Sequence, residues 1–178
     1  MEPLVEVSVA RLGLDGSSNS YVVILREKDG TRMLPIWIGQ PEAESILLEI
    51  NQVRKERPLT HDLCKSLIVG LGAQLHRVQI TRMEHRTYFA ELHLIRGAEV
   101  FQVDARPSDS IAIALRTGSP VFAAESLLLE SPNDSDEGDE PGLIPPGELP
   151  PPADEMTPQQ LKDYLAGLRP EDFGKFNP

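Results

Sequence analysis

Apolar and polar residues alternate along much of the first forty positions. Such a two-residue period places one face of a β-strand against a core and the other toward water. This alternation, together with a run rich in β-branched residues, predicts three strands, over residues 4–11, 21–25 and 32–38. Pro35 lies in the third strand and has no N–H for a ladder hydrogen bond, which favours a sheet edge or a bulge there.

A helical period of apolar residues predicts three helices. The first begins near Pro41 and carries apolar residues at three- and four-residue spacings. The second is expected to have Thr60 as its N-cap and to end at Gly72. The third begins at Pro107 and ends at Gly118. One face of the second helix is formed by Leu63, Leu67, Ile68 and Leu71.

Four further strands are predicted around the third helix, over residues 78–80, 88–95, 100–104 and 121–123. The order along the chain is therefore three strands, two helices, three strands, one helix and one strand. Strands grouped as hairpins with helices between them are typical of α+β domains. We expect a mixed, largely antiparallel sheet with three helices packed on it.

The composition changes abruptly after residue 130. Ten of the 16 prolines follow that point, and residues 131–156 include only five apolar residues among 26. Such a segment cannot bury enough surface to offset the entropy of ordering it, so we expect a disordered acidic linker. Residues 157–178 begin with capping residues and an apolar stripe, which predict a short C-terminal helix. The folded domain is expected to span residues 1–130.

Charge follows the same division. The net charge of the chain is −11, but residues 1–130 carry only −3 of it and residues 131–178 carry −8. Eleven of the 14 basic residues in the first part are arginines, whose planar guanidinium suits phosphate or carboxylate ligands. The overall acidity therefore does not exclude a nucleic acid as a ligand of the domain.

The sequence argues against secretion and against insertion in a membrane. Cys64 is the single cysteine and cannot form an internal disulfide. The first residues lack a basic segment followed by an apolar one, and no apolar run approaches the roughly 20 residues that a membrane span needs. We expect a cytoplasmic protein with no membrane contact, in which Cys64 serves packing rather than catalysis.

Two helix starts concentrate residues that could carry chemistry. Each has an Arg-Pro pair and an acid, a faint repeat that would fit two similar halves. The first block holds Arg57, Thr60, His61 and Asp62, and the second holds Asp104, Arg106, Ser108 and Asp109. Arginines beside helix N-termini are suited to anions. We predict that the aspartates and arginines of both blocks gather in one cleft.

The same residues also have ordinary structural explanations. Acids in a first turn, among them Glu42, Glu44 and Asp109, complement the helix dipole, and Thr60 and Ser108 are common caps. The sequence contains no P-loop, dinucleotide fingerprint, HExxH motif or nucleophile elbow. An active site would leave at least one carboxylate unpaired, whereas a structural network would satisfy each of them.

Three blocks of sequence, over residues 34–43, 57–63 and 104–116, together resemble the bifunctional nuclease (BFN) domain family. The resemblance spans about residues 4–130, and the closing residues 161–173 are similar to the tail of some bacterial members. It implies an α+β domain that forms homo-oligomers and a nuclease activity on RNA and DNA. The positions that match the motifs are Glu42, Arg57, Thr60, His61, Asp62, Asp104, Arg106, Ser108, Asp109 and Arg116.

We therefore expect a bacterial, metal-assisted nuclease that hydrolyses phosphodiester bonds. In this hypothesis Asp62, Asp104 and Asp109 hold Mg²⁺ or Mn²⁺, and His61 and Glu42 assist catalysis. The substrate would be bound by Arg57, Thr60, Arg106, Ser108 and Arg116. The alternative is a non-catalytic regulatory module that binds a phosphorylated ligand or a partner through the same arginines and helix starts.

Overall fold

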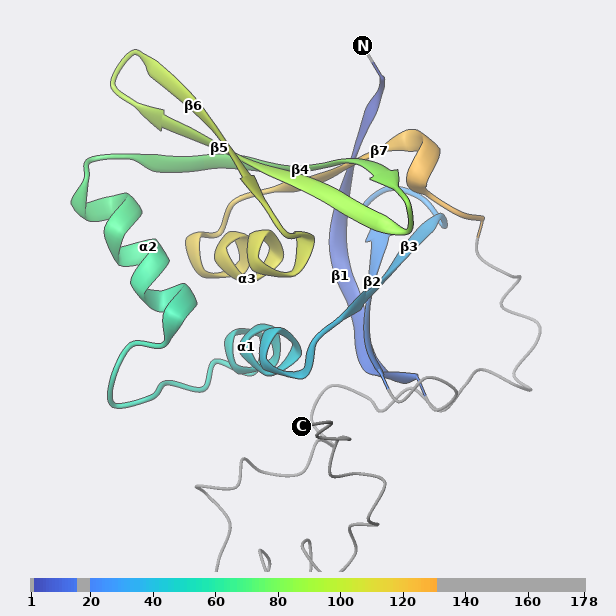
Figure 1. Ribbon diagram of the computed structural model, residues 1–178, viewed down its shortest axis with the longest axis horizontal. Coiled ribbons are helices and arrows are strands. Elements are labelled where there is room, and N and C mark those ends of the chain that lie inside the picture. Colours follow the sequence, from blue (N-terminus) through green and yellow to red (C-terminus); the bar gives the residue numbers. More distant parts are fainter. Residues whose placement is uncertain (1, 16–19, 131–178) are drawn as a thin grey trace, which may run out of the picture. The chain divides into compact units, whose positions relative to one another are not determined.

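The structure is a computed structural model that describes residues 2–15 and 20–130 (Figure 1). The predicted linker, residues 131–156, and the predicted C-terminal helix within 157–178 lie outside the described residues. The last described residues are tied to the sheet, because Leu129 and Met33 exchange two backbone hydrogen bonds of 2.8 Å.

Seven strands make up one curled sheet within the described residues, in the order β3-β2-β1-β7-β4-β5-β6 (Figure 1). Neighbouring strands are antiparallel, except that β4 and β7 are parallel. The predicted edge position of Pro35 is confirmed, since β3 is the first strand of the sheet. The strands are β1 (Leu4–Asp15), β2 (Ser20–Glu27), β3 (Met33–Ile38), β4 (Gln74–Glu84), β5 (Thr87–Arg96), β6 (Glu99–Ala105) and β7 (Val121–Ala124).

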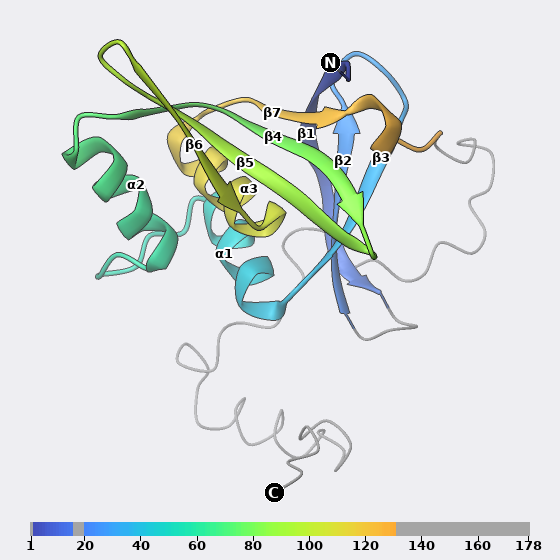
Figure 2. The same ribbon diagram turned by 45° about the horizontal axis from the view of Figure 1, so that its top comes forward.

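The described part of the chain forms three α-helices, α1 (Gln40–Ile50), α2 (Thr60–Gly70) and α3 (Pro107–Thr117), and a short 3-10 turn, Glu125–Leu127. Helices α1 and α3 lie side by side within the curve of the sheet, and α2 lies beyond them near the β5–β6 turn (Figures 1 and 2). Gly118 ends α3 with φ of 68°, a left-handed conformation that glycine adopts without strain. The α+β prediction is confirmed.

Two strands extend beyond their predicted limits because bulges interrupt the alternation. Strand β1 runs to Asp15, and its register shifts between Val9 and Arg11. Strand β4 begins at Gln74, and its register shifts between Leu75 and Arg77. A bulge adds one residue and exchanges the two faces of a strand, so a two-residue period cannot be followed through it.

The element order repeats, although not where the sequence indicated. Strands β1–β3 followed by α1 match strands β4–β6 followed by α3, and β7 lies between the two sets. The equivalent helix starts are therefore those of α1 and α3, and α2 lies between the two repeats. Glu42 and Asp109 are each the third residue of their helix, so the repeat places two carboxylates at matching positions.

Strands β4 and β5 pack against α3 and form a hydrophobic core with it. Buried side chains of β4, β5 and α3 form one cluster, which includes Val78, Leu92 and Ile113. Cys64 of α2 packs against this cluster, as expected for a packing role.

Helix α2 differs from its prediction in two respects. Its N-cap is Leu59 rather than Thr60, and the backbone N–H of Leu59 donates to Asp62 Oδ2 at 2.9 Å. Its apolar face is also largely uncovered, because Leu63 is 50% exposed and Leu67 55% exposed. Contact with the core is made through Ile68, at one side of the predicted face, and through Cys64 beside it. An apolar period identifies a helix, but it does not determine which neighbour covers that face.

Candidate active site

The first turns of α1 and α3 meet through Arg106, the N-cap of α3. Its Nη2 lies 2.7 Å from Glu42 Oε1 of α1, and its Nε donates to Asp109 Oδ2 at 2.7 Å. A Cβ atom at Gly39 would clash with Oε2 of Glu42, so the glycine leaves room for the Glu42 carboxylate in this position. The Arg106 side chain is 65% exposed, whereas that of Glu42 is 15% exposed. The Arg106 guanidinium is therefore exposed to solvent, with the carboxylates of Glu42 and Asp109 beside it. The polar network that links the three helices is called the junction, and its residues are Glu42, Ser45, His61, Asp62, Arg106, Asp109 and Arg116.

His61 connects α2 to both other helices. Its Nε2 lies 3.0 Å from Asp109 Oδ1, and its Nδ1 lies 2.7 Å from Ser45 Oγ of α1. The His61 side chain is buried. Since both ring nitrogens are engaged, His61 in this arrangement orients Asp109 and has no nitrogen available to a water molecule.

Asp62 and Arg116 form a further ion pair of the junction, with 2.6 Å between Asp62 Oδ1 and Arg116 Nε. Arg116 lies in the last turn of α3, and its side chain is only 3% exposed. It also donates to the carbonyl oxygens of Ala112 and Ser45. Although Arg116 was predicted to bind substrate, this burial gives it the role of holding α1, α2 and α3 together.

Ser45 was not anticipated from the sequence. Its hydroxyl contacts His61, and its carbonyl oxygen accepts a hydrogen bond of 3.1 Å from Arg116 Nη2. It thus links the Asp109 and Asp62 parts of the junction. A serine among the apolar residues of α1 was the available signal, because a buried hydroxyl needs a partner.

Electrostatics keep the aspartates of the junction ionised. Burial alone would raise the pKa of Asp109, but hydrogen bonds from Arg106 and His61 outweigh it and hold that pKa below its ordinary value. Burial likewise acts to raise the pKa of Asp62, and hydrogen bonds from Arg116 and the Leu59 N–H lower it overall. The hydrogen bond to Asp109 raises the pKa of the Arg106 guanidinium.

Each carboxylate of this junction has an arginine partner. Glu42 and Asp109 pair with Arg106, and Asp62 pairs with Arg116. A network in which every carboxylate has a partner is the pattern expected of a structural role. Within residues 2–15 and 20–130, no three His, Cys, Asp or Glu side chains are grouped so that they could hold a metal ion. The side chains as they lie here therefore do not fit the predicted divalent cation.

Asp104 lies apart from the junction. It pairs in register with Glu91 of β5, while its neighbour Val103 pairs with Leu92, which is buried in the core under the sheet. Because successive side chains of a strand point to opposite faces, Asp104 lies on the face of the sheet away from the helices. Of the residues predicted to share one cleft, Arg106 and Asp109 therefore contact each other. Asp62 instead pairs with Arg116 at the other end of α3, and Asp104 lies on the other face of the sheet.

Three other predicted residues have different surroundings. Arg57 is exposed in the loop between α1 and α2, and Thr60 is exposed in the first turn of α2. Ser108 is buried in the first turn of α3. Arg57 and Thr60 are accessible to a ligand, whereas Ser108 is not.

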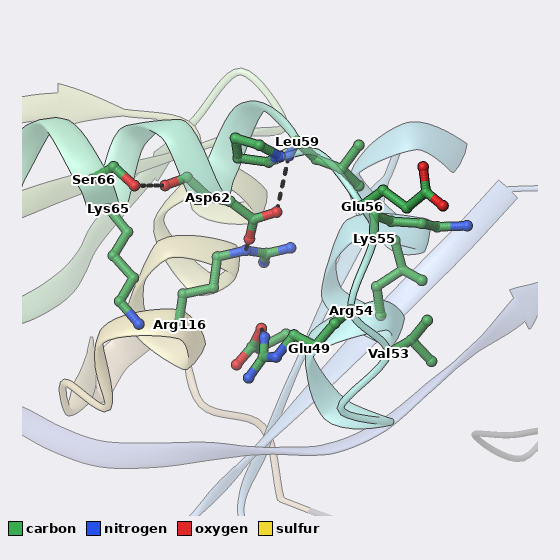
Figure 3. A pocket seen from close by; sticks show the side chains of 12 residues that line it. Glu49, Val53, Arg54, Lys55, Glu56, Leu59, Asp62, Lys65, Ser66 and Arg116 are labelled. Atoms are coloured by element: carbon green, nitrogen blue, oxygen red, sulfur yellow. Dashed lines mark hydrogen bonds and ion pairs between the residues drawn. The ribbon is translucent and has the colours of Figure 1, made fainter.

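A pocket of about 350 Å³ adjoins the junction (Figure 3). It lies between the end of α1, the loop that follows, α2 and the last turn of α3, and it shares Asp62 and Arg116 with the junction. Its other lining residues are Leu48, Glu49, Val53, Arg54, Lys55, Glu56, Pro58, Leu59, Lys65 and Ser66.

None of the helices in the described part of the chain is long and apolar enough to cross a membrane.

Comparison with known proteins supports the resemblance seen in the motifs. An uncharacterized protein of Mycobacterium tuberculosis strain H37Rv is 40% identical over 172 residues, which cover 94% of this chain and 97% of that protein. Bifunctional nuclease 1 of Oryza sativa subsp. indica is 29% identical over 114 residues, covering 62% of this chain and 34% of that protein. Bifunctional nuclease 1 of Arabidopsis thaliana is 30% identical over 103 residues, covering 56% and 32%.

The match to the plant proteins is thus confined to about a third of their length. Residues 23–135 of the chain match the family described as the bifunctional nuclease domain, and this region contains α1, α2, α3 and the whole junction. The chain belongs to the bifunctional nuclease domain family.

Proposed function

We propose that the protein is a nuclease that hydrolyses phosphodiester bonds of RNA or DNA. Family membership and the names of the plant relatives support this class of activity. The observation that carries the proposal is the exposed Arg106 guanidinium, held by Asp109, which is itself oriented by the buried His61. An exposed guanidinium offers two parallel N–H donors to a phosphate.

The arrangement suggests how substrate binding would prepare a base. A phosphodiester that binds Arg106 competes with Asp109 for the same N–H groups. Once Arg106 turns to the phosphate, Asp109 loses the hydrogen bond that lowers its pKa, and its carboxylate becomes a better proton acceptor. His61 keeps this carboxylate in place, so Asp109 would take a proton from the attacking water while Arg106 stabilises the charge on the phosphate.

Cleavage of labelled oligonucleotides by the purified full chain tests this proposal. Asp109→Asn keeps the shape of the side chain but removes the base, and it should lower the cleavage rate by about 10² or more. Asp29→Asn, in an exposed turn, is the matched control and should cleave like the wild type. If Asp109→Asn cleaves at the wild-type rate, Asp109 is not the base.

The predicted Mg²⁺ or Mn²⁺ is examined in the same assay by adding each ion or EDTA. The paired carboxylates of the junction give no group of three ligands among the described residues, so no step above uses a metal. Activity that survives EDTA would agree with this arrangement. Activity that requires the ion would indicate that the arginines release their carboxylates when the metal binds.

The alternative is a non-catalytic module that binds a phosphorylated ligand at Arg106. The full pairing of Glu42, Asp62 and Asp109 favours it, because a network with every carboxylate satisfied is suited to holding a fixed shape. Wild-type protein that binds oligonucleotides through Arg106 but does not cleave them under any metal condition would establish this alternative.

We also propose that the chain forms homo-oligomers through the outer face of α2. Leu63, Leu67 and Leu71 expose half or more of their surface there, and contiguous exposed apolar surface commonly marks an interface. Light scattering of the wild type should give a mass above the monomer, and Leu63→Ser with Leu67→Ser should return it to the monomer. A monomeric wild type would overturn this proposal.

A further inference from the structure

We propose that the pocket beside the junction binds a nucleoside 5′-phosphate unit, with the phosphate at its cations and the base against its apolar residues. This inference rests on the proposed nuclease function, since it supplies a place for one nucleotide of the substrate or product. The volume of about 350 Å³ lies within the usual range of small-molecule sites, roughly 300–1,000 Å³.

The cations of the pocket come from α2, from α3 and from the loop between α1 and α2. Four lining residues are cations and three are acids, which gives a local excess of positive charge on a chain whose net charge is −11. Glu49 pairs with Arg54, and Asp62 pairs with Arg116, so two of the acids are already compensated. Because these pairs compensate the two arginines as well, the excess positive charge comes from the lysines of the lining.

Lys65 is the cation best placed to bind the phosphate. It is exposed on α2, and it forms no ion pair with any other residue that the structure describes. Its side chain extends from α2 toward the last turn of α3, beside Arg116 (Figure 3). Arg54 is 66% exposed and lies in the loop after α1, so it can turn from Glu49 to a phosphate without moving buried groups.

The pocket also has an apolar part. Leu48, Val53, Pro58 and Leu59 line it. Val53 is 41% exposed and Leu59 39% exposed, so apolar surface is available to the flat face of a base. The described lining contains no aromatic side chain, so the base would be held by contact area rather than by stacking. A preference for one base is therefore not expected.

The pocket is connected to the junction through shared residues. Asp62 and Arg116 line the pocket. Arg116 also donates to the carbonyl oxygen of Ser45, whose hydroxyl contacts His61. A nucleotide bound in the pocket would thus lie beside Arg116, about two helical turns along α3 from Asp109.

Anisotropy of a fluorescently labelled AMP, titrated with the full chain, tests the pocket without using activity. Unlabelled AMP should displace the probe at least about tenfold better than adenosine, because the phosphate supplies the charged hydrogen bonds. Lys65→Gln should weaken binding about tenfold for the same reason. Glu56→Gln, which removes the remaining acid of the lining, should strengthen it.

Lys28→Gln provides the matched control. Lys28 is an exposed lysine in the turn after β2 that pairs with Glu6 of β1, and it does not line the pocket. It should bind AMP like the wild type. Equal binding by Lys65→Gln and the wild type, or equal displacement by AMP and adenosine, would overturn the proposal.

Competition with oligonucleotides distinguishes two sources of the bound phosphate, the end of a strand and a free nucleotide. If the pocket receives the end of a strand, a 5′-phosphorylated oligonucleotide should displace the probe better than its 5′-hydroxyl form. If it receives free nucleotides only, the two forms should compete equally and more weakly than AMP. AMP binding without any cleavage would leave the pocket established and the nuclease proposal refuted, whereas cleavage without AMP binding would refute the pocket alone.

Discussion

Helices α2 and α3 are both eleven residues long, and both have an Arg-Pro pair at their start, yet their surroundings differ greatly. Eight residues of α3 are buried, including Ser108, Ser110 and Arg116. In α2 only His61 is buried, and Leu63 and Leu67 are exposed. Helix α3 lies within the curve of the sheet, whereas α2 touches the core along a single stripe.

Because of this difference, α3 and α2 have separate roles in the junction. Helix α3 supplies a fixed support, on which Arg106 and Asp109 are set at one end and Arg116 at the other. Helix α2 brings His61 and Asp62 to that support from its first turn and leaves the rest of its surface available. The accessible groups of the site thus stand on the most buried helix, as a preorganised site requires.

Replacing one apolar residue in each helix gives the strongest test of the comparison. Ile111→Ala in α3 removes a side chain that is 0% exposed and should lower the free energy of unfolding by about 3 kcal/mol. Leu67→Ala in α2, where the side chain is 55% exposed, should change it by less than about 0.5 kcal/mol in the monomer. Urea titrations of both variants measure this, and equal losses would contradict the comparison.

Replacing Arg116 tests the connection between the helices. Arg116→Met keeps much of the buried volume but removes the partner of Asp62, and the free energy of unfolding should fall by about 2 kcal/mol. Arg96→Met removes an exposed pair with Glu99 and should cost less than about 1 kcal/mol. If the two variants are equally stable, Arg116 does not hold the junction together.

Acid should weaken the junction through its two aspartates. The pKa of Asp109 and that of Asp62 lie below the ordinary value of 3.8 in the folded protein. Their stabilisation is therefore fully present above that value and is lost as the pH falls through their folded pKa values. Chemical unfolding at a series of acidic pH values should show a shallower pH dependence in Asp109→Asn than in the wild type. A matching profile for both proteins would argue against the Asp109 contribution.

The smallest effect is expected from shortening the chain. Truncation after Glu130 keeps the backbone hydrogen bonds between Leu129 and Met33, and it removes only residues that the sequence predicts to be linker and tail. Thermal unfolding should shift little and remain cooperative. A broad transition would show that residues 131–178 belong to the core.

Much of the fold could be predicted from the sequence because its signals are local. The start of α3 at Pro107, its end at Gly118 and the edge position of Pro35 all follow from the backbone chemistry of proline and glycine. The bulges in β1 and β4 could not be predicted, because they interrupt the period on which strand limits depend.

The site was only partly predictable for a different reason. Motif positions identified His61, Arg106 and Asp109, which the structure brings into contact. They also identified Asp62, which pairs with Arg116 near the other end of α3. Asp104 is only two residues before Arg106, but strand alternation turns its side chain to the other face of the sheet. Ser45 was missed because its role depends on contacts with residues 16 and 71 positions away along the chain.

Strand β7 is the last strand along the described chain and the middle strand of the sheet. Strands β1–β3 and strands β4–β6 can pair within their own sets as soon as each is synthesised, but β1 and β4 reach each other only through residues 121–124. During synthesis the sheet therefore exists as two separate pieces until Val121–Ala124 arrive. A chain that stops short of these residues would keep two unpaired strand edges, which are templates for aggregation.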